Sequence, residues 1–213
     1  MSTFAAHSLR AKSIARWPLQ LALKPTNVAE HCFESSIIAL ILATIESEVF
    51  NNKEISPERT CVLAMLHESS EWGGATDIAK NVKYHDKETF DAIKKVESFY
   101  EDKLLSSLDA FPPGVRKLFE PLIKQDKADP HAVLAKYADH IHALYESEKE
   151  VRLHNAEFTQ PYIEQVCVVE ELCAKSPACQ YFMTHFYPSF HHKMDSSSEK
   201  VRKVNASFET VTI

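Results

Sequence analysis

The chain has 213 residues, which suits one large domain, and its hydrophobic and charged contents of 45% and 25% are ordinary for a globular protein. Its formal net charge of −6 argues against a long basic surface for DNA or RNA, although a small phosphorylated substrate needs only one or two local cations. With only three glycines, the chain contains no glycine-rich phosphate loop and is a poor match to a fold rich in β-hairpins.

The apolar spacing predicts helices along most of the chain. In chain order they cover about 3–14, 27–46, 56–68, 86–108, 113–123, 129–145, 159–175 and 177–186. Three of them begin where a side chain able to cap a helix precedes a proline, at Ser56-Pro57, Asp129-Pro130 and Ser176-Pro177. Alternation at period two is nearly absent before the last few residues. We therefore predict an all-α fold, a single-domain helical bundle.

Apolar residues line one face of two of these helices. After Ser56 the face consists of Cys61, Val62, Met65 and Leu66. After Asp129 it consists of Val133, Leu134, Tyr137, Ile141, Leu144 and Tyr145. Such stripes are typical of helices that pack on a core.

The segment from about His191 onward is polar and serine-rich. We expect residues 1–190 to form the domain and residues 191–213 to form a loosely attached tail. Within that tail, Val204–Ile213 could pair with another segment as a short strand.

His7, Arg10 and Lys12 interrupt the apolar residues near the N-terminus, so we expect no signal peptide. No stretch is expected to approach the length of a membrane span.

Five cysteines, Cys32, Cys61, Cys167, Cys173 and Cys179, include no CxxC pair. The last three are spaced by six residues, a gap that tetrahedral zinc sites rarely use, so we expect free thiols in a cytoplasmic protein.

Four potential metal ligands are distributed over three predicted helices: His31, the adjacent pair His67 and Glu68, and Asp139. Each lies among apolar residues, where an unpaired charge is costly to bury and a shared cation would remove that cost. Two imidazoles and two carboxylates suit a borderline divalent ion such as Zn²⁺, Mn²⁺, Co²⁺ or Fe²⁺. Taken singly, each residue is more readily explained as a surface or capping residue, whereas the spacing of all four together leaves the two interpretations evenly balanced.

The segment His67-Glu68-Ser69-Ser70-Glu71 is similar to the HExxH motif of zinc peptidases. That motif needs a second histidine one helical turn after the first, and Glu71 occupies the position here. Because a defining ligand is missing, we do not expect a peptidase.

Several longer motifs occur in order between about residues 4 and 192. They are Arg16-Trp17-Pro18-Leu19, Asn27-Val28-Ala29-Glu30-His31, Leu63-Ala64-Met65-Leu66-His67-Glu68-Ser69-Ser70-Glu71, Val82-Lys83-Tyr84, Phe119-Glu120-Pro121-Leu122-Ile123, Lys136-Tyr137-Ala138-Asp139, Tyr181-Phe182-Met183 and Pro188-Ser189-Phe190. Together they resemble the HD-domain metal-dependent phosphohydrolase superfamily, and within it most closely the bacterial 5′-deoxynucleotidases.

The resemblance implies a helical bundle of the HD type that assembles as a homodimer. It implies one divalent metal ion, Co, Mn, Zn or Fe, held by His31, His67, Glu68 and Asp139. The implied reaction is hydrolysis of deoxyribonucleoside 5′-monophosphates to deoxynucleoside and phosphate. The expected partner is therefore a small-molecule nucleotide, with no nucleic acid polymer and no membrane.

The resemblance also implies roles for residues around the metal. Arg16 would bind the phosphate, Trp17 would pack near the sugar and disfavour a ribose 2′-hydroxyl, and Asp77 would bind the sugar. Glu71 would position or deprotonate the attacking water. We add Lys80, shortly after Asp77, as a candidate substrate-binding residue. A guanidinium fork and a Lewis-acidic metal both neutralise the charge that builds on phosphate oxygens during hydrolysis.

Two departures from the family pattern leave other functions open. Glu68 stands where the family has an aspartate, and Ile78-Ala79-Lys80 follows Asp77 where the family usually has Leu-Pro-Thr. One alternative is a nucleoside triphosphate or other phosphoester hydrolase on the same scaffold. A second alternative is a nucleotide-binding protein that lost turnover with the change at Glu68.

Overall fold

The structure is a computed structural model that describes residues 1–191. Its α-helices are α1 (Phe4–Ser8), α2 (Val28–Thr44), α3 (Pro57–Leu66), α4 (Lys80–Lys83), α5 (Lys87–Ser106), α6 (Pro113–Ile123), α7 (Pro130–Arg152), α8 (Thr159–Lys175) and α9 (Pro177–His185). Its shorter helical turns are η1 (Ala11–Ser13), η2 (Ile45–Val49), η3 (Glu71–Ala75), η4 (Ala156–Phe158) and η5 (Tyr187–His191). The only β-type pairing in this part of the chain is one isolated bridge between Ala15 and Asn27.

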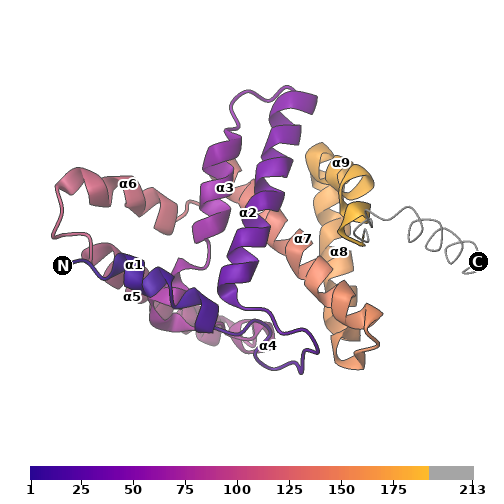
Figure 1. Cartoon of the computed structure of the whole chain (residues 1–213), viewed down its shortest axis with the longest axis horizontal. Helices are drawn as coiled ribbons and strands as arrows, with labels where there is room; N and C mark the ends of the chain where they lie inside the picture. Colours follow the sequence, from indigo (N-terminus) through magenta and orange to yellow (C-terminus); the bar gives the residue numbers. More distant parts are fainter. Residues whose placement is uncertain (192–213) are drawn as a thin grey trace, which may run out of the picture.

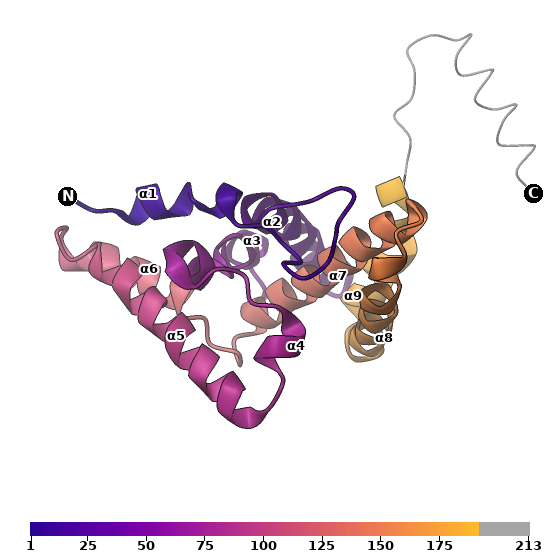
Figure 2. The same cartoon turned by 90° about the horizontal axis from the view of Figure 1, so that it is seen from below.

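Helices α2, α3 and α7 form the centre of the bundle and pack against one another. Figures 1 and 2 show α8 and α9 on one side of this centre, and α1, α5 and α6 on the other. One apolar core joins α2, α3, α7, α8 and α9, with Leu42, Leu63 and Phe182 fully buried. A second core joins α2 with η3, α5 and α6 around Trp72 and Leu105. The prediction of an all-α bundle is confirmed.

Local signals explain where several helices begin. The Ser56 hydroxyl accepts a hydrogen bond from the Arg59 amide at 3.1 Å, the Asp129 carboxylate from the His131 amide at 2.9 Å, and the Ser176 hydroxyl from the Cys179 amide at 3.2 Å. Each of the three predicted caps is confirmed. Asp129 also accepts from Arg59 Nη2 at 2.7 Å, so the cap of α7 ties that helix to α3.

Two helix predictions need correction. The segment 3–14 is not one helix but α1 followed by η1, and only Ala11 in these two elements is buried, so little packing supports a longer helix. On α3, Val62 and Met65 are 37% and 44% exposed. The buried face consists instead of Thr60, Leu63 and Ala64, whose small members allow α2 and α7 to approach closely. The larger apolar side chains, from which the sequence predicted the packed face, therefore indicated the wrong face of this helix.

Helix α2 and η2 form a continuous run, Val28–Val49, that is long and apolar enough to cross a membrane by length and composition, with a mean hydropathy of 1.6. The expectation that no stretch reaches this length is therefore wrong by that criterion. However, 56% of its most apolar window is buried inside the fold. The run packs against α3 and α7 and carries the buried polar residues His31 and Ser35, which indicates a core helix.

The other sequence-based expectations concern the cysteines and the tail. All five cysteines are free thiols, and among residues 1–191 the side-chain groups close enough to share an ion contain no cysteine. Apart from His191, the predicted tail 191–213 and the possible strand Val204–Ile213 lie outside the described residues.

The loop between η1 and α2 carries Arg16 and Trp17 and is held by carboxylates of α7. Glu150 is 3% exposed and accepts hydrogen bonds from the backbone amides of Leu23 at 2.8 Å and Lys24 at 2.6 Å. It also accepts from Asn155 Nδ2 at 2.7 Å. A single buried carboxylate therefore satisfies three donors and fixes the end of this loop against the bundle.

We predict that Glu150→Gln lowers the midpoint of thermal unfolding by about 2–10 °C. The amide nitrogen that replaces one oxygen is a donor facing other donors, and a buried unsatisfied group costs about 1–3 kcal/mol. Thermal unfolding followed by circular dichroism measures the shift. The matched control is Glu157→Gln, because the exposed Glu157 contacts the same loop at the Leu21 amide, 3.2 Å away. Equal midpoints for the two variants would contradict this role for Glu150.

Candidate metal centre

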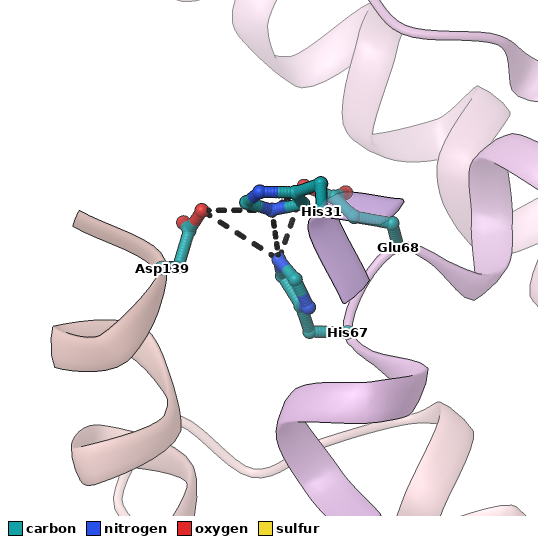
Figure 3. Close-up of side chains that lie close together, drawn as sticks. All are labelled: His31, His67, Glu68 and Asp139. Carbon is teal, nitrogen blue, oxygen red and sulfur yellow. Dashed lines mark hydrogen bonds and ion pairs between the residues drawn. The ribbon is translucent and has the colours of Figure 1, made fainter. Parts of the chain in front are cut away.

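Four side chains from three segments converge at the junction of the two cores. His31 lies on α2 between core residues Val28 and Ile38, His67 and Glu68 follow the end of α3, and Asp139 lies in the middle of α7. Figure 3 shows these side chains pointing toward one another. One ligand atom from each lies within 4.8 Å of the others. The structure thus brings together the four residues that the sequence proposed as metal ligands.

The donor atoms are spaced as ligands of one small cation would be. His31 Nε2 lies 3.0 Å from His67 Nε2 and 3.2 Å from Asp139 Oδ1. Glu68 Oε1 lies 3.3 Å from His67 Nε2 and 3.9 Å from His31 Nε2. Tetrahedral bonds of about 2.1 Å to a zinc-like ion separate neighbouring donors by about 3.4 Å. The cluster therefore fits a divalent ion with small adjustments of its side chains.

Hydrogen bonds on the far side of each imidazole orient it toward the cluster. His67 Nδ1 donates to the carbonyl oxygen of Ala64 at 2.6 Å, one turn earlier in α3. His31 Nδ1 lies 2.8 Å from His142 Nδ1. In each ring the Nε2 atom therefore faces the two carboxylates. This is the arrangement in which a neutral histidine offers a lone pair to a metal.

Charges in the cluster are strongly coupled because the site is almost closed to water. Burial opposes the charged form of His67, but Glu68 and Asp139 outweigh it and raise the pKa of His67 well above its ordinary value. Burial raises the pKa of Asp139, yet Lys136 and the two imidazoles bring it well below its ordinary value. In the protein without a metal ion, a proton on His67 balances the same carboxylates that a cation would bind.

Burial dominates at His31 and lowers its pKa to about 4, helped by the nearby charge of Arg16. His31 is fully buried, so its ring stays neutral across the physiological range. A neutral ring is the form that binds a metal, which is a second reason why these donors suit a cation.

Arg16 connects the cluster to a second buried carboxylate. Its Nη1 lies 3.6 Å from Glu68 Oε1 and its Nη2 lies 3.4 Å from Glu146 Oε2. Burial works against the charge of Arg16, but Glu146, Glu68 and Asp139 outweigh it and raise the pKa of Arg16. Its Nε atom is buried and has no hydrogen-bond partner in the described structure. A buried unpaired donor beside the cluster is suited to an anionic ligand.

Trp17 and Asp77 lie beside Arg16. The Trp17 indole nitrogen donates to Glu146 Oε2 at 3.2 Å, and its ring packs edge-on against Phe158 with a centroid distance of 5.4 Å. Burial raises the pKa of Asp77, and the charge of Arg16 opposes this shift. The backbone is strained at both places: Trp17 itself has φ of 56°, and Thr76, the residue before Asp77, has φ of 60°. Non-glycine residues in this region cost energy and concentrate at functional sites.

Glu71 begins η3, one turn after His67. Burial raises its pKa to about 10, and the neighbouring carboxylates of Glu68 and Asp77 add to the shift. Its Oε2 atom is buried without a hydrogen-bond partner in the described structure. A carboxyl group in these surroundings can hold a proton at neutral pH and is placed next to a candidate metal ligand.

Lys80 does not join the cluster. Its side chain is 53% exposed at the start of α4, and its Nζ lies 3.9 Å from Glu164 Oε2 on α8. Its assignment as a substrate-binding residue stays a prediction.

The sequence reasoning assigned no role to Lys136, His142 and Glu146. Lys136 Nζ bonds Asp139 Oδ2, which leaves Asp139 Oδ1 for the imidazoles. His142 and Glu146 follow Asp139 by three and seven residues, so all of them lie on one face of α7. Helical spacing from Asp139 is the signal that would have identified them.

Comparison with known proteins matches nearly the whole chain to one family. The family model described as 5′-deoxynucleotidase YfbR-like matches residues 3–190. A 5′-deoxynucleotidase of Vibrio parahaemolyticus is 35% identical over 198 residues, which is 92% of this chain and 98% of that protein. The 5′-deoxynucleotidase YfbR of Escherichia coli is 33% identical over 199 residues, which is 93% of this chain and 96% of that protein.

Solved structures share the fold at lower sequence identity. An HD-domain phosphohydrolase from Listeria innocua superposes with a TM-score of 0.75 at 20% identity. The match covers 99% of this chain and 98% of the Listeria chain. The structure of the HD phosphohydrolase DatZ of cyanophage S-2L, bound to dA and one catalytic Zn²⁺ ion, superposes with a TM-score of 0.56 at 16% identity. The match covers 87% of this chain and 95% of the DatZ chain. The fold and kinship predicted from the sequence are confirmed: the chain has the fold of the HD-domain phosphohydrolase structures and belongs to the YfbR-like 5′-deoxynucleotidase family.

Proposed function

We propose that this protein is a metal-dependent phosphoric monoester hydrolase that converts deoxyribonucleoside 5′-monophosphates to deoxynucleoside and phosphate. The observation that carries the proposal is the convergence of His31, His67, Glu68 and Asp139 within 4.8 Å, with the unpaired donor of Arg16 beside them. Membership of the 5′-deoxynucleotidase family favours this reaction over hydrolysis of triphosphates.

The four converging residues would hold one divalent ion, for which Zn, Mn, Co and Fe are the candidates. When bound, such an ion supplies Lewis acidity toward phosphate oxygens and lowers the pKa of water. Asp139 is prepared for this role because Lys136 occupies its second oxygen and leaves the first directed at the imidazoles.

Arg16 provides the positive charge for the phosphate group. Its guanidinium is held by two carboxylates from different elements, Glu68 and Glu146, so its position is fixed before substrate arrives. The unpaired Nε can donate to a phosphate oxygen without breaking either contact.

Glu71 provides a proton-transfer group. The buried Oε2 atom of Glu71 has no hydrogen-bond partner in the described structure, so it can exchange a proton. Glu71 lies beside Glu68, at the edge of the ligand cluster. In this proposal Glu71 orients the attacking water, and a cation bound in the cluster would offset the charge of Glu68, lower the pKa of Glu71 and leave its carboxylate able to take a proton from that water.

Trp17 and Asp77 shape the sugar site. The hydrogen bond from Trp17 to Glu146 and its contact with Phe158 make the indole a rigid wall, which we propose disfavours the extra 2′-hydroxyl of a ribonucleotide. Asp77 can accept a hydrogen bond from a sugar hydroxyl beside that wall.

The proposal includes a homodimer. Helices α2 and α3 pack on each other and expose apolar side chains, Phe33, Ile37, Val62 and Met65, to between 37% and 61%. Exposed apolar residues on adjoining helices are typical of surfaces that become buried on association.

The same proposal places the protein in the cytoplasm, where it acts on free nucleotides rather than on a polymer or at a membrane.

The first prediction from the proposed function is that the metal-loaded protein releases orthophosphate from deoxynucleoside monophosphates, and does so faster than from the matching ribonucleotides. Asp139→Ala should lower kcat/KM by at least about 100-fold, because even partners behind a ligand cost 10–100-fold. The control Asp126→Ala changes an exposed aspartate outside the cluster and should leave kcat/KM unchanged. Phosphate detection with product analysis by ion exchange makes the measurement. Pyrophosphate or triphosphate as the product would select the alternative hydrolase, and no product from any nucleotide would overturn the proposal.

The second prediction concerns stability without turnover. A divalent ion at 100 times its dissociation constant should stabilise the native protein by about 2.7 kcal/mol and raise the unfolding midpoint by about 5–10 °C. Differential scanning calorimetry with and without metal measures the shift. His67→Ala should abolish the shift, whereas His131→Ala, a histidine at the start of α7 outside the cluster, should retain it. An unchanged metal-dependent shift in His67→Ala would show that the ion binds elsewhere.

The third prediction separates an adapted enzyme from a degenerate one. Glu68 Oε1 already reaches His67 Nε2 at 3.3 Å and Arg16 Nη1 at 3.6 Å, so the longer side chain serves the site as it stands. Glu68→Asp should therefore not raise kcat, since the shorter side chain draws the oxygen back by about 1.5 Å. A gain of more than about tenfold in steady-state kcat would instead support loss of turnover through the glutamate.

A further inference from the structure

A chain of buried hydrogen bonds leads from the surface to the candidate ligand His31. Glu34 lies one turn after His31 on α2, and its side chain is 48% exposed. Glu34 Oε2 lies 2.6 Å from His142 Nε2, and His142 Nδ1 lies 2.8 Å from His31 Nδ1. His142 is 1% exposed and His31 is fully buried, so no solvent competes for the inner bond.

One arrangement of protons satisfies every bond in this chain and leaves His31 able to bind a cation. His31 Nε2 faces the cluster, so the ring proton of His31 is on Nδ1 and is donated to His142 Nδ1. His142 Nδ1 then accepts, and its own proton is on Nε2 and is donated to Glu34. Reversing the inner bond would place the His31 proton on Nε2, where it would block the lone pair.

The surroundings of His142 support this assignment. Glu146 Oε2 lies 3.6 Å from His142 Nδ1, which is beyond hydrogen-bond distance. The hydroxyl of Ser35 lies 3.4 Å from His31 Nδ1 and is a poorer partner than His142. The hydrogen bond from His142 holds the pKa of Glu34 below its ordinary value, as expected for a carboxylate that accepts from an imidazole.

His31, His142 and Glu146 also lie close enough together to suggest a second metal ion. The geometry speaks against that interpretation. Glu146 already accepts from the Thr26 hydroxyl at 2.5 Å and from the Trp17 indole at 3.2 Å, and it pairs with Arg16. An ion there would have to displace these donors and would lie beside a guanidinium. The group therefore supports the metal centre and does not duplicate it.

We propose that His142 and Glu34 are positioning residues that fix the ring orientation and tautomer of His31 for metal binding. The inference rests on the proposed metal site but is independent of which phosphoester is hydrolysed. Groups that accept a hydrogen bond from a metal-binding histidine raise its basicity and lock its ring, and their loss typically weakens metal binding about 10–100-fold. Here the carboxylate acts through an intervening imidazole, so a residue on the surface supports a ligand in the core.

The test is the dissociation constant for Zn²⁺, measured on metal-free full-length protein by competition with a chromophoric chelator. His142→Ala should weaken Zn²⁺ binding by about 10–100-fold, because His31 loses its main orienting partner. Glu34→Gln should weaken it in the same direction but by less, since an amide oxygen still accepts from His142 without a charge. Glu34 is half-exposed, so this variant tests the proposal even if the substitution of His142 prevents folding.

The chain provides matched controls on the same helix. His131 is likewise bonded at both ring nitrogens, to the Ser56 amide at 3.0 Å and to Asp129 at 2.7 Å. Glu148 likewise accepts from a histidine, His191, at 3.0 Å. His131→Ala and Glu148→Gln should lower the unfolding midpoint without changing the dissociation constant.

The outcomes separate this inference from the proposed function. Zn²⁺ binding by His142→Ala and Glu34→Gln within about twofold of the unmodified protein would overturn the positioning role while leaving the metal site intact. An equal loss of affinity in the two control variants would also overturn it, because the effect would then be general destabilisation. No Zn²⁺ binding by the unmodified protein would remove the metal site and this inference together.

Discussion

The structure depends on balancing negative charge inside a helical core. Glu68, Asp139 and Glu146 are carboxylates with side chains only 5–20% exposed, and buried carboxylates are tolerated only when cations or donors surround them. Arg16 pairs with Glu68 and Glu146, Lys136 pairs with Asp139, and His67 lies between Glu68 and Asp139. Two carboxylates and two imidazoles still share one small volume, which a divalent ion would neutralise.

Helix α7 organises this balance. Along one face it presents Asp139 to the cluster, His142 to the back of His31, Glu146 to Arg16 and Trp17, and Glu150 to the loop before α2. One candidate metal ligand, Asp139, therefore lies on this helix, and the same helix contacts a second ligand, His31, and the candidate phosphate-binding residue Arg16. This arrangement explains why a loop as irregular as the one carrying Arg16 and Trp17 can hold both side chains in place.

The sequence was sufficient to predict the fold and the convergence of four side chains, and the reasons are visible at particular residues. Proline after a capping side chain located the starts of α3, α7 and α9, because those signals act locally. Kinship located His31, His67 and Asp139, whereas spacing alone did not. The buried face of α3 was misjudged because Ala64 and Thr60 are buried through close helix contact, which size and hydrophobicity do not reveal. Helical spacing from Asp139 places His142 near the site, but its hydrogen bond to Glu34 joins residues 108 apart in the chain, and the sequence assigned that pair no role.

The most direct test of the account is anomalous diffraction from crystals of the metal-loaded protein, recorded on both sides of the absorption edge of the bound ion. The account predicts one anomalous peak, bonded to His31 Nε2, His67 Nε2, a Glu68 oxygen and Asp139 Oδ1. A peak at any other group of side chains, or these four donors turned away from the ion, would contradict it.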